Sequence, residues 1–588
     1  MDNKPAVSSI PALKTTKGDW IFEPKTKANI FSETFSSKYE LIQEEENEYT
    51  EICASDVQQT SGPLPSEEDA AKILCALRID SATGPDLLST RMLRECAGQI
   101  AKPFRTLAKS ILHYKTWPRP WMVHWIVPLY KKGSTFIPGN YRGIHLTPQI
   151  SKAMERFLGS MISTYVSLPA CVGPNQFAYQ KARGARDALA FMALTWISGF
   201  NNKLKFSIYC SDVSSAFDRV SRRRLVAKLR AKGISEEFIA IFDAWLQERE
   251  ARVAVGGQYG DPMRLRNMIY QGTVWGPWLW NIFYEDARLA LQVCEFREIV
   301  FADDLNAYRS FPIATPTENL IAEAKTCQKE LHKWGRANQV QFDPGKESIH
   351  VVSHHAPAGN NFKILGLDFD CRLVMGDAIC GLTSEMRWRV RSILRAQRYH
   401  TTANMLHLYK AKVLSYAEYR TAAIYHASGT LLQQVDRVQE SFLEDVGIDA
   451  ISAFLVFNLA PLSLRRNIAM LGLIHRTVLG HGPEHFKQWF YREDVVNRTT
   501  TRFKRHRFRL HEYIDGLQLA VVKRSALGLV SIYNMLPAEI MEAKTVKCFQ
   551  GLLQDLAKDC ASRSLPQCDS IYSTRHMLHA HPLRAFAS

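Results

Sequence analysis

Two adjacent aspartates within REIVFADDLNAY, Arg297–Tyr308, constrain the fold of this chain more than any other feature. Apolar runs of strand length flank Asp303 and Asp304, so the pattern predicts a β-hairpin with both carboxylates at its tip. Neighbouring carboxylates repel each other unless a cation neutralises them, which makes this tip a candidate metal site. Taken alone, the pair is more commonly a solvated turn.

A second carboxylate follows a separate strand-like run. In FSIYCSDVSSAFDRV, Phe206–Val220, the apolar run ends at Asp212, and a helix is expected to begin near Ser214 or Ser215. If the two strands meet at one sheet edge, their aspartates provide the oxygen ligands that hard divalent ions prefer. Two Mg²⁺ ions bridged by carboxylates support phosphoryl transfer, because they hold the attacking and leaving oxygens. The alternative is that Asp212 simply caps a helix.

The composition indicates a globular protein that binds a polyanion. Of the 588 residues 46% are hydrophobic, which excludes a disordered or fibrous protein. The 74 Lys and Arg residues outnumber the 58 Asp and Glu residues, so the net charge is +16. Such a chain is attracted to phosphate polymers or anionic membranes. Its uncharged stretches are shorter than the ~18–20 residues of a spanning helix, so we expect no membrane insertion.

The cysteines and the N-terminus indicate the compartment. The twelve cysteines are scattered without a C-x-x-C pair, so neither a disulfide framework nor a zinc knuckle is expected. In the C-terminal tail, Cys560, Cys568, His576, His579 and His581 match no zinc module either. The N-terminal segment has no continuous apolar stretch of the signal-peptide type. We therefore expect a protein of the nucleus or cytoplasm.

Local patterning predicts an α+β protein. Between Phe206 and Asp370, strand-length apolar runs alternate with helical stretches, whereas the chain is almost wholly helical in pattern from Ser384 to Phe490. Upstream, a helical stretch from Thr90 to His113 precedes a short strand at Ile126–Tyr130.

Nine segments then occur in an informative order. They are DSATGPDLL, WIVPLYKKG, NYRGIHLTPQISKAMERFL, NQFAYQKARGARDAL, SDVSSAFDRV, QGTVWGPWLWNIFYEDA, FADDLNAY, DPGKESIHVVS and FKILGLDFD. In this order they resemble the reverse transcriptases of non-LTR (LINE-type) retrotransposons. The resemblance extends from about Ala28 to Leu552. It implies a right-hand polymerase with fingers, a palm containing an antiparallel sheet, a helical thumb and a helical C-terminal region.

The resemblance also suggests domain boundaries. We expect an N-terminal extension and linker at 1–70, fingers at 71–202, a palm at 203–372, a thumb at 373–490 and a basic, mostly helical C-terminal region at 491–588. No endonuclease domain of the family is recognisable, so the source of a target-DNA nick is left open.

The carboxylates receive specific roles from the resemblance. It implies that Asp212 and Asp303 are catalytic metal ligands, that Val213 adds its main-chain carbonyl, and that Asp304 is a supporting catalytic carboxylate. The implied cofactor is a pair of Mg²⁺ ions, with Mn²⁺ as a possible substitute. The implied partners are an RNA template, a DNA primer or target DNA, and dNTPs.

Four further residues match positions that hold the incoming nucleotide. Lys131, Lys132 and Arg142 match basic residues of the fingers that pair with the triphosphate. Phe217 lies five residues after Asp212, where the family carries an aromatic ring that blocks the ribose 2′-OH. The alternatives are an exposed turn for the two lysines and a core aromatic on a helix face for Phe217.

The later motifs add three residues and two departures. Gln271 is implied to contact the nucleotide and template, and Gly272 to permit close backbone approach. Lys346 is implied to assist the leaving pyrophosphate, although a plain turn lysine fits equally well. Trp278 replaces the small residue or proline usual in the family, and Asp343 replaces a frequent asparagine. Neither departure removes a metal ligand.

Two basic segments are candidate nucleic-acid contacts. Arg387, Arg391 and Arg395 recur at helical spacing with Arg398 close by, as expected of a thumb helix along a template–primer backbone or of a solvated face. The second segment combines Lys504, Arg505 and Arg507 with aromatic rings, which suits single-stranded RNA or a strand pair with basic edges.

The sequence therefore predicts an RNA-directed DNA polymerase. Two alternatives remain open: a catalytically weak or domesticated nucleic-acid-binding remnant, and an RNA-dependent RNA polymerase. Phe217 argues against the second alternative, because RNA polymerases usually place a smaller or polar group near the sugar. The oligomeric state, the template RNA and the target site are left open.

Overall fold

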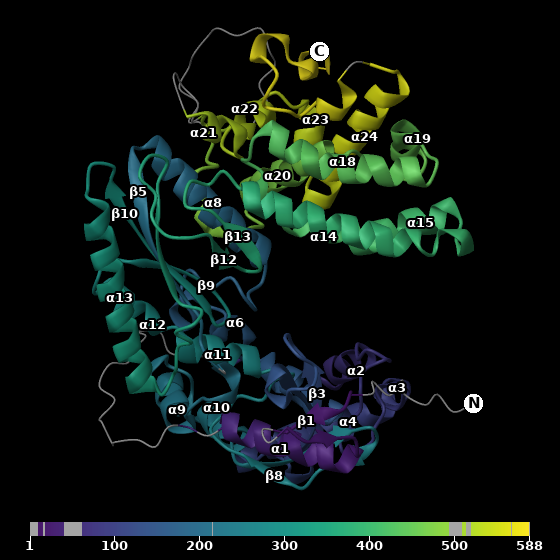
Figure 1. The fold of residues 1–588 in the computed structure, drawn as a ribbon. Coiled ribbons are helices and arrows are strands. Elements are labelled where there is room, and N and C mark those ends of the chain that lie inside the picture. Colours follow the sequence, from purple (N-terminus) through teal and green to yellow (C-terminus); the bar gives the residue numbers. More distant parts are fainter. Residues whose placement is uncertain are drawn as a thin grey trace. The chain divides into compact units, whose positions relative to one another are not determined.

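A computed structural model of the chain describes residues 10–15, 18–39, 41, 61–214, 216–492, 508–512, 519–565 and 567–586. The chain forms two compact units that alternate along the sequence (Figure 1). The first unit contains the residues up to Tyr179 together with Ser211–Glu298 and Cys327–Glu347. The second unit contains Gln180–Cys210, Ile299–Thr326 and the residues from Ser348 onward.

A five-stranded mixed sheet forms the centre of the first unit. Its strands are β3 (Val123–Tyr130), β4 (Tyr141–Leu146), β6 (Arg249–Val255), β7 (Gln258–Tyr259) and β8 (Met263–Leu265). Their order is β4-β3-β6-β7, and β8 also pairs with β6. β3 is antiparallel to β4 and parallel to β6. Alternate residues of β4 are buried, as expected where one face of a sheet is covered.

The first unit also contains helices. They are α1 (Pro24–Tyr39), α2 (Glu67–Cys75), α3 (Thr90–Glu95), α4 (Ala97–Tyr114), α5 (Gln149–Gly159), α6 (Ser163–Val166), α7 (Pro169–Val172), α9 (Arg222–Ala231), α10 (Glu236–Trp245), α11 (Gly276–Tyr284) and α12 (Ala287–Gln292). The short turns η1 (Arg119–Met122), η2 (Pro138–Asn140) and η3 (Ala216–Asp218) and the hairpin of β1 (Leu13–Lys14) and β2 (Trp20–Ile21) complete the unit. Buried Trp117, Trp245 and Trp275 pack together in its core.

The second unit contains a four-stranded sheet in the order β11-β5-β10-β9. Its strands are β5 (Leu204–Ser211), β9 (Arg297–Phe301), β10 (Asp304–Pro312) and β11 (Ser348–Val352). β5 lies inside the sheet and is buried along nearly its whole length, which explains its continuous apolar pattern. A hairpin of β12 (Phe362–Ile364) and β13 (Leu367–Phe369) follows, and Trp196 of α8 (Ala185–Asn201) packs against both of its strands.

The remainder of the second unit is helical where it is described. The longer helices are α14 (Gly376–Leu394), α15 (Thr402–Tyr409), α18 (Gly429–Asp445), α20 (Leu462–Val478) and α24 (Val546–Ser562). The shorter ones are α16 (Ser415–Tyr419), α17 (Thr421–Ile424), α19 (Ala450–Leu455), α21 (Ala520–Arg524), α22 (Leu529–Asn534) and α23 (Ala538–Met541). The unit also contains the π-helix η5 (Lys410–Leu414) and the short 3₁₀ helices η4 (Gln397–Tyr399), η6 (Glu484–Gln488), η7 (Cys568–Ser570), η8 (Leu578–Ala580) and η9 (Pro582–Phe586). α14 packs against α18, and α20 packs against α24.

The structure confirms the α+β prediction and corrects one local detail. The expected helix after Asp212 begins later: η3 is a short 3₁₀ turn, and α9 starts only after its cap, Ser221. The reason is that Val213 still forms a β-bridge with Phe342, so the backbone remains extended beyond β5. None of the helices in the described residues is long and apolar enough to cross a membrane.

Candidate active site

The Asp-Asp pair lies at the tip of a hairpin, as predicted. β9 ends at Phe301 and β10 begins at Asp304, so Ala302 and Asp303 form a two-residue turn. Ala302 has a φ of 60°, the left-handed conformation that tight hairpin turns require at their first central position. The neighbour of β10 on its other side is β5, the strand that Asp212 directly follows. The hairpin therefore presents Asp303 and Asp304 at consecutive positions, the second already within the strand.

Three side chains of the second unit share the surroundings of Asp304. Burial, with a contribution from the Asp304 charge, raises the pKa of Cys210 to about 12. Burial also raises the pKa of Tyr419. The charge of Arg186 acts to lower this pKa, and the charge of Asp304 acts to raise it. The Tyr419 hydroxyl donates to the carbonyl of Leu365, at the turn between β12 and β13, over 3.1 Å. Sequence analysis did not identify Tyr419, and it gave no role to Arg186, although Arg186 lies in the NQFAYQKARGARDAL segment.

In the first unit, Asp212 is held by the segment that carries Lys346. The Asp212 carbonyl accepts from the amide of Asp343 at 2.9 Å, and the Ser214 amide donates to the carbonyl of Gln341 at 2.8 Å. This pairing directs the Asp212 carbonyl toward the segment that contains Phe342. Because successive carbonyls of an extended strand point to opposite sides, the Val213 carbonyl points away from that segment.

Lys346 bridges two carboxylates. Its ammonium donates to Asp212 and, over 2.8 Å, to Asp343. Partial burial acts to lower the pKa of Lys346, but the hydrogen bonds to these two carboxylates raise it overall. The ammonium is therefore fully charged at neutral pH. Asp343, which departs from the family pattern, thus serves to hold Lys346.

The basic residues that we predicted for the fingers interact electrostatically with Asp212 and Lys346 through Lys131. Lys131 and Lys132 directly follow β3, and Arg142 pairs in register with Leu129 on β4; all three are exposed. Burial lowers the pKa of Lys131, and the charges of Arg142 and Lys346 lower it further, while Asp212 opposes them. The first unit thus collects Lys132, Arg142 and Lys346 around Lys131, with Asp212 acting on both Lys131 and Lys346.

Gln271 contacts a residue that sequence analysis did not identify. The Gln271 side-chain amide donates to Asp218 over 2.8 Å. Burial raises the pKa of the Asp218 carboxyl to about 6, although Gln271 and three nearby cations oppose this. Gly272 has a φ of 90°, and a Cβ at this position would lie 3.2 Å from the carbonyl of His145. The sequence signal for Asp218 was its place six residues after Asp212 in the same motif.

This arrangement predicts a pH-dependent contribution of Asp218 to stability. Because its pKa is about 6 in the native state against an ordinary 3.8, the native state binds more protons between these values. The contribution favours folding below the lower value and is lost as the pH rises through about 6. Asp218→Asn is therefore expected to stabilise the protein at pH 7.5 by roughly 1–3 kcal/mol and to have little effect near pH 4. Urea titrations at both pH values measure this difference, and an equal effect at both would contradict it.

The alternative interpretation of Phe217 required a position on the face of an α-helix. Phe217 instead lies in the short 3₁₀ turn η3. Its ring is half-buried and stacks on Trp280 of α11, with centroids 5.3 Å apart. Trp280 therefore holds the ring from one side while part of its surface remains accessible.

Glu155, another residue that the sequence did not single out, holds the backbone after Gly272. This fully buried carboxylate of α5 accepts from the amides of Val274 at 2.7 Å and Trp275 at 3.2 Å. Burial raises the pKa of Glu155, and these hydrogen bonds oppose the shift. Bulky Trp278 lies against Gly159 one turn further along α5.

The predicted thumb arginines share one exposed surface of the second unit. Arg387 and Arg391 lie on α14, Arg395 caps it, and Arg398 lies in η4; all four are exposed. None of the four has an acidic partner among the residues that the structure describes. Arg389 differs, because it pairs with Glu385. The other predicted basic residues, Lys504, Arg505 and Arg507, lie outside the described residues.

The side-chain chemistry is compatible with the predicted metal site, but neither unit by itself contains a complete set of ligands in the described residues. Within the described part of the chain, no group of three or more His, Cys, Asp or Glu side chains is arranged to hold a metal, and this includes the Cys and His residues of the C-terminal tail. The Asp212 carboxylate does hold a cation, the Lys346 ammonium, so its donor chemistry fits a divalent ion. Asp303 and Asp304 belong to the second unit, and their sharing of an ion with Asp212 stays a prediction.

Comparison with known protein families identifies the domain. Residues 129–369 match the family described as reverse transcriptase (RNA-dependent DNA polymerase). The matched region contains every predicted carboxylate and nucleotide-binding residue. Residues 129–369 therefore carry a reverse transcriptase domain.

Individual relatives agree with this reverse transcriptase assignment. The chain is 23% identical over 408 residues, 64% of its length, to the RNA-directed DNA polymerase from mobile element jockey of Drosophila melanogaster, covering 44% of that protein. It is 20% identical over 419 residues to the probable RNA-directed DNA polymerase from transposon X-element of the same species, covering 68% of the chain and 46% of the relative. It is also 24% identical over 311 residues to the Pol polyprotein from type-1 retrotransposable element R1 of Bradysia coprophila, covering 50% and 29%. The chain thus spans about half or less of the length of these relatives.

Proposed function

We propose that this protein is an RNA-directed DNA polymerase that extends the 3′-OH of a DNA primer along an RNA template. The observation that carries the proposal is the reverse transcriptase match, which includes Asp212 and the Asp303–Asp304 hairpin. In this assignment the β3–β4 region belongs to the fingers, the sheet around β5 and β10 to the palm, and α14 with its neighbours to the thumb.

The aspartates hold the cofactor in this proposal. Asp212, Asp303 and the Val213 carbonyl would hold two Mg²⁺ ions, with Asp304 in support. The bound ions would lower the pKa of the primer 3′-OH and hold the triphosphate. The turn of the Val213 carbonyl away from the Phe342 segment supports its assignment as a ligand. The chain itself positions groups and neutralises charge, which is the main task in phosphoryl transfer.

The cations of the first unit bind the dNTP triphosphate. Arg142 offers a planar fork and Lys131 and Lys132 offer point charges, at exposed positions that a polyanionic ligand can reach. Lys346 supplies charge or a proton to the leaving pyrophosphate, and its raised pKa keeps the proton available at neutral pH. A bound triphosphate would offer Lys346 phosphate oxygens in place of the Asp212 carboxylate, and this carboxylate would then be available to hold the metal.

The side chain of Phe217 provides the test of sugar selection. We expect Phe217→Val to raise incorporation of UTP relative to dTTP by about 10–100-fold, because a smaller side chain on the Trp280 surface leaves room for the 2′-OH. Steady-state kinetics with each nucleotide on poly(rA)–oligo(dT) measure the ratio. The dTTP rate serves as the internal control, and an unchanged ratio would remove Phe217 from the sugar pocket.

One assay distinguishes the proposed function from its alternatives. The purified chain receives poly(rA)–oligo(dT), Mg²⁺ or Mn²⁺, and either dTTP or UTP. Extension with dTTP supports the proposal. Binding of the primer–template without extension indicates a nucleic-acid-binding remnant, and a preference for UTP indicates an RNA-dependent RNA polymerase.

A further inference from the structure

The turn that carries Lys346 is contacted by a helix that has no residue in the sequence motifs of the site. This helix is α13 (Thr317–Asn338), and its part from Cys327 onward belongs to the first unit. Within the turn, the amides of Lys346 and Glu347 both donate to the carbonyl of Asp343, at 2.9 and 3.2 Å. Because Lys346 and Glu347 belong to one short hydrogen-bonded turn, a contact that fixes Glu347 also restricts Lys346.

The carboxylate of Glu347 is almost completely removed from water, since its side chain is only 4% exposed. It accepts from Nε2 of His332 at 2.8 Å and from the side-chain amide of Gln328 at 3.3 Å. His332 and Gln328 are four residues apart, and they therefore lie on one side of α13. A buried carboxylate is costly without such donors, so the two hydrogen bonds favour one position of the Glu347 side chain.

The same histidine makes a second contact with the segment that precedes Lys346. Its ring stacks on Phe342, with centroids 5.1 Å apart and ring planes inclined by only 6°. A glycine of α13 makes room for Phe342, because a Cβ at Gly335 would lie 2.7 Å from the phenyl ring. Phe342 in turn forms the β-bridge with Val213. His332 thus contacts the segment on both sides of the turn residue Lys346.

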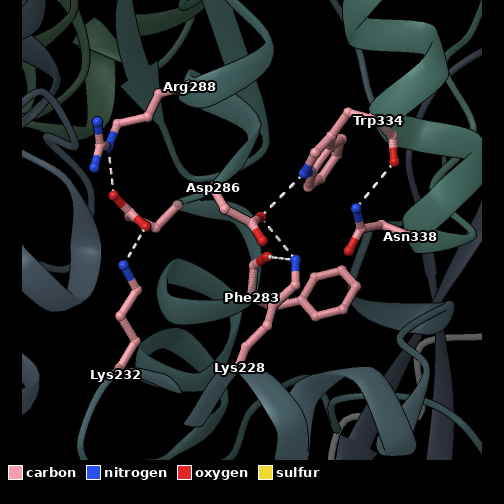
Figure 2. A network of polar contacts seen from close by, with 8 residues as sticks. Lys228, Lys232, Phe283, Asp286, Arg288, Trp334 and Asn338 are labelled. Carbon is pink, nitrogen blue, oxygen red and sulfur yellow. Dashed lines mark hydrogen bonds and ion pairs between the residues drawn. The ribbon is translucent and has the colours of Figure 1, made fainter. Parts of the chain in front are cut away.

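The part of α13 that carries His332 is itself fixed to the first unit (Figure 2). The indole of Trp334, two residues further along the helix, donates to buried Asp286 over 3.0 Å. The side-chain amide of Asn338 donates to the Trp334 carbonyl, also over 3.0 Å. This end of α13 therefore provides a fixed point of attachment for Glu347.

We propose that His332 and Glu347 form a positioning pair that fixes the Lys346 ammonium for the departure of pyrophosphate. The proposal rests on the proposed polymerase function, in which Lys346 supplies charge or a proton to this leaving group. The ammonium lies between the carboxylates of Asp212 and Asp343. A lysine ammonium sits on a flexible stem, so the backbone turn that carries it has to be held if the charge is to stay in one place. His332 and Glu347 act only through Lys346.

The pair is expected to affect the chemical step and not nucleotide binding. His332→Phe keeps a flat ring against Phe342 but removes the donor, and Glu347→Leu removes the acceptor. Each variant is expected to lower the single-turnover rate constant of dTTP incorporation by about tenfold, while the Kd for dTTP stays within about twofold. Glu347→Gln keeps an oxygen acceptor for His332 and is expected to retain most of the rate.

A double-mutant cycle separates positioning from a general loss of structure. If the pair acts through Lys346, His332→Phe causes little further loss in a Lys346→Met background, because the group that it positions is absent. Equal proportional losses in the two backgrounds would show a structural role and overturn the proposal. Rate constants of both single variants within about twofold of wild type would also overturn it.

The measurements use rapid-quench kinetics of the full chain on poly(rA)–oligo(dT), and thermal unfolding of each variant reports its folding. Glu330→Leu is the matched control, because it makes the same substitution on α13, where Glu330 pairs with Lys333 of the same helix over 3.8 Å. We expect this control to keep the wild-type rate constant. A wild-type chain that extends no primer refutes the polymerase function, whereas an active wild type with unimpaired variants refutes only the positioning pair.

Discussion

Asp303→Ala is expected to reduce primer extension by about 10³-fold or more while binding of the primer–template remains. The residue occupies the two-residue turn at the hairpin tip, where its carboxylate is one of the proposed Mg²⁺ ligands. Loss of a metal ligand removes stabilisation of charge that develops on the attacking and leaving oxygens, an effect of several kcal/mol. Alanine keeps the main-chain amide and carbonyl of this position, so the main-chain hydrogen bonds of the two strands remain available.

Extension of oligo(dT) on poly(rA) with dTTP measures this loss, and anisotropy on the same substrate measures binding. Asp19→Ala provides the control, because Asp19 is an exposed aspartate of the first unit that precedes both the family-like segments and the matched family region. Asp212→Asn is expected to show a comparable loss and also to release Lys346. Activity within tenfold of wild type in Asp303→Ala would refute the metal-ligand role of the hairpin.

The second large effect concerns a buried ionic network in the first unit (Figure 2). Lys228 of α9 donates to Asp286 over 2.8 Å and to the carbonyl of Phe283 over 2.6 Å. The side chains of Lys228 and Asp286 are only 1% and 4% exposed. Trp334 of α13 (Thr317–Asn338) also donates to Asp286 over 3.0 Å. Beside it, Lys232 pairs with Glu285, which Arg288 also contacts.

We expect Lys228→Met to lower the free energy of unfolding by about 3–5 kcal/mol, because it leaves the Asp286 carboxylate buried without its cation. Burial lowers the pKa of Lys228 to about 8, although Asp286 acts to raise it. The attraction between the two charges therefore does not outweigh the free-energy cost of removing the Lys228 ammonium from water. The double variant Lys228→Met with Asp286→Leu is therefore expected to recover most of the lost stability.

Urea titrations followed by tryptophan fluorescence measure these changes. Arg230→Met is the matched control on the same helix, because the side chains of Arg230 and Glu236 are 58% and 67% exposed and such ion pairs contribute little. We expect its effect to stay below about 0.5 kcal/mol. A loss in Lys228→Met no greater than in this control would show that the buried pair contributes no more to stability than an exposed one.

Local patterns were sufficient to predict several elements. The hairpin around Asp303 and the strand that ends before Asp212 were recognisable because their apolar runs and turns lie within about a dozen residues. The exposed arginine face of α14 was recognisable because a helix repeats every 3.6 residues. The prediction of a helix directly after Asp212 was wrong, because Val213 pairs with the distant Phe342 and this pairing keeps the backbone extended.

The sequence alone thus specified which chemical groups the chain carries and in what order. It also specified the local helix or strand on which each group lies, because local structure depends on residues that are neighbours in sequence. The pairing of Gln271 with Asp218, of Glu155 with the Val274 amide, and of Lys228 with Asp286 depended instead on folding. These partners lie 53 or more residues apart. Periodicity carries no information about such partners, because burial and the low dielectric of the interior assign them only when distant elements pack together.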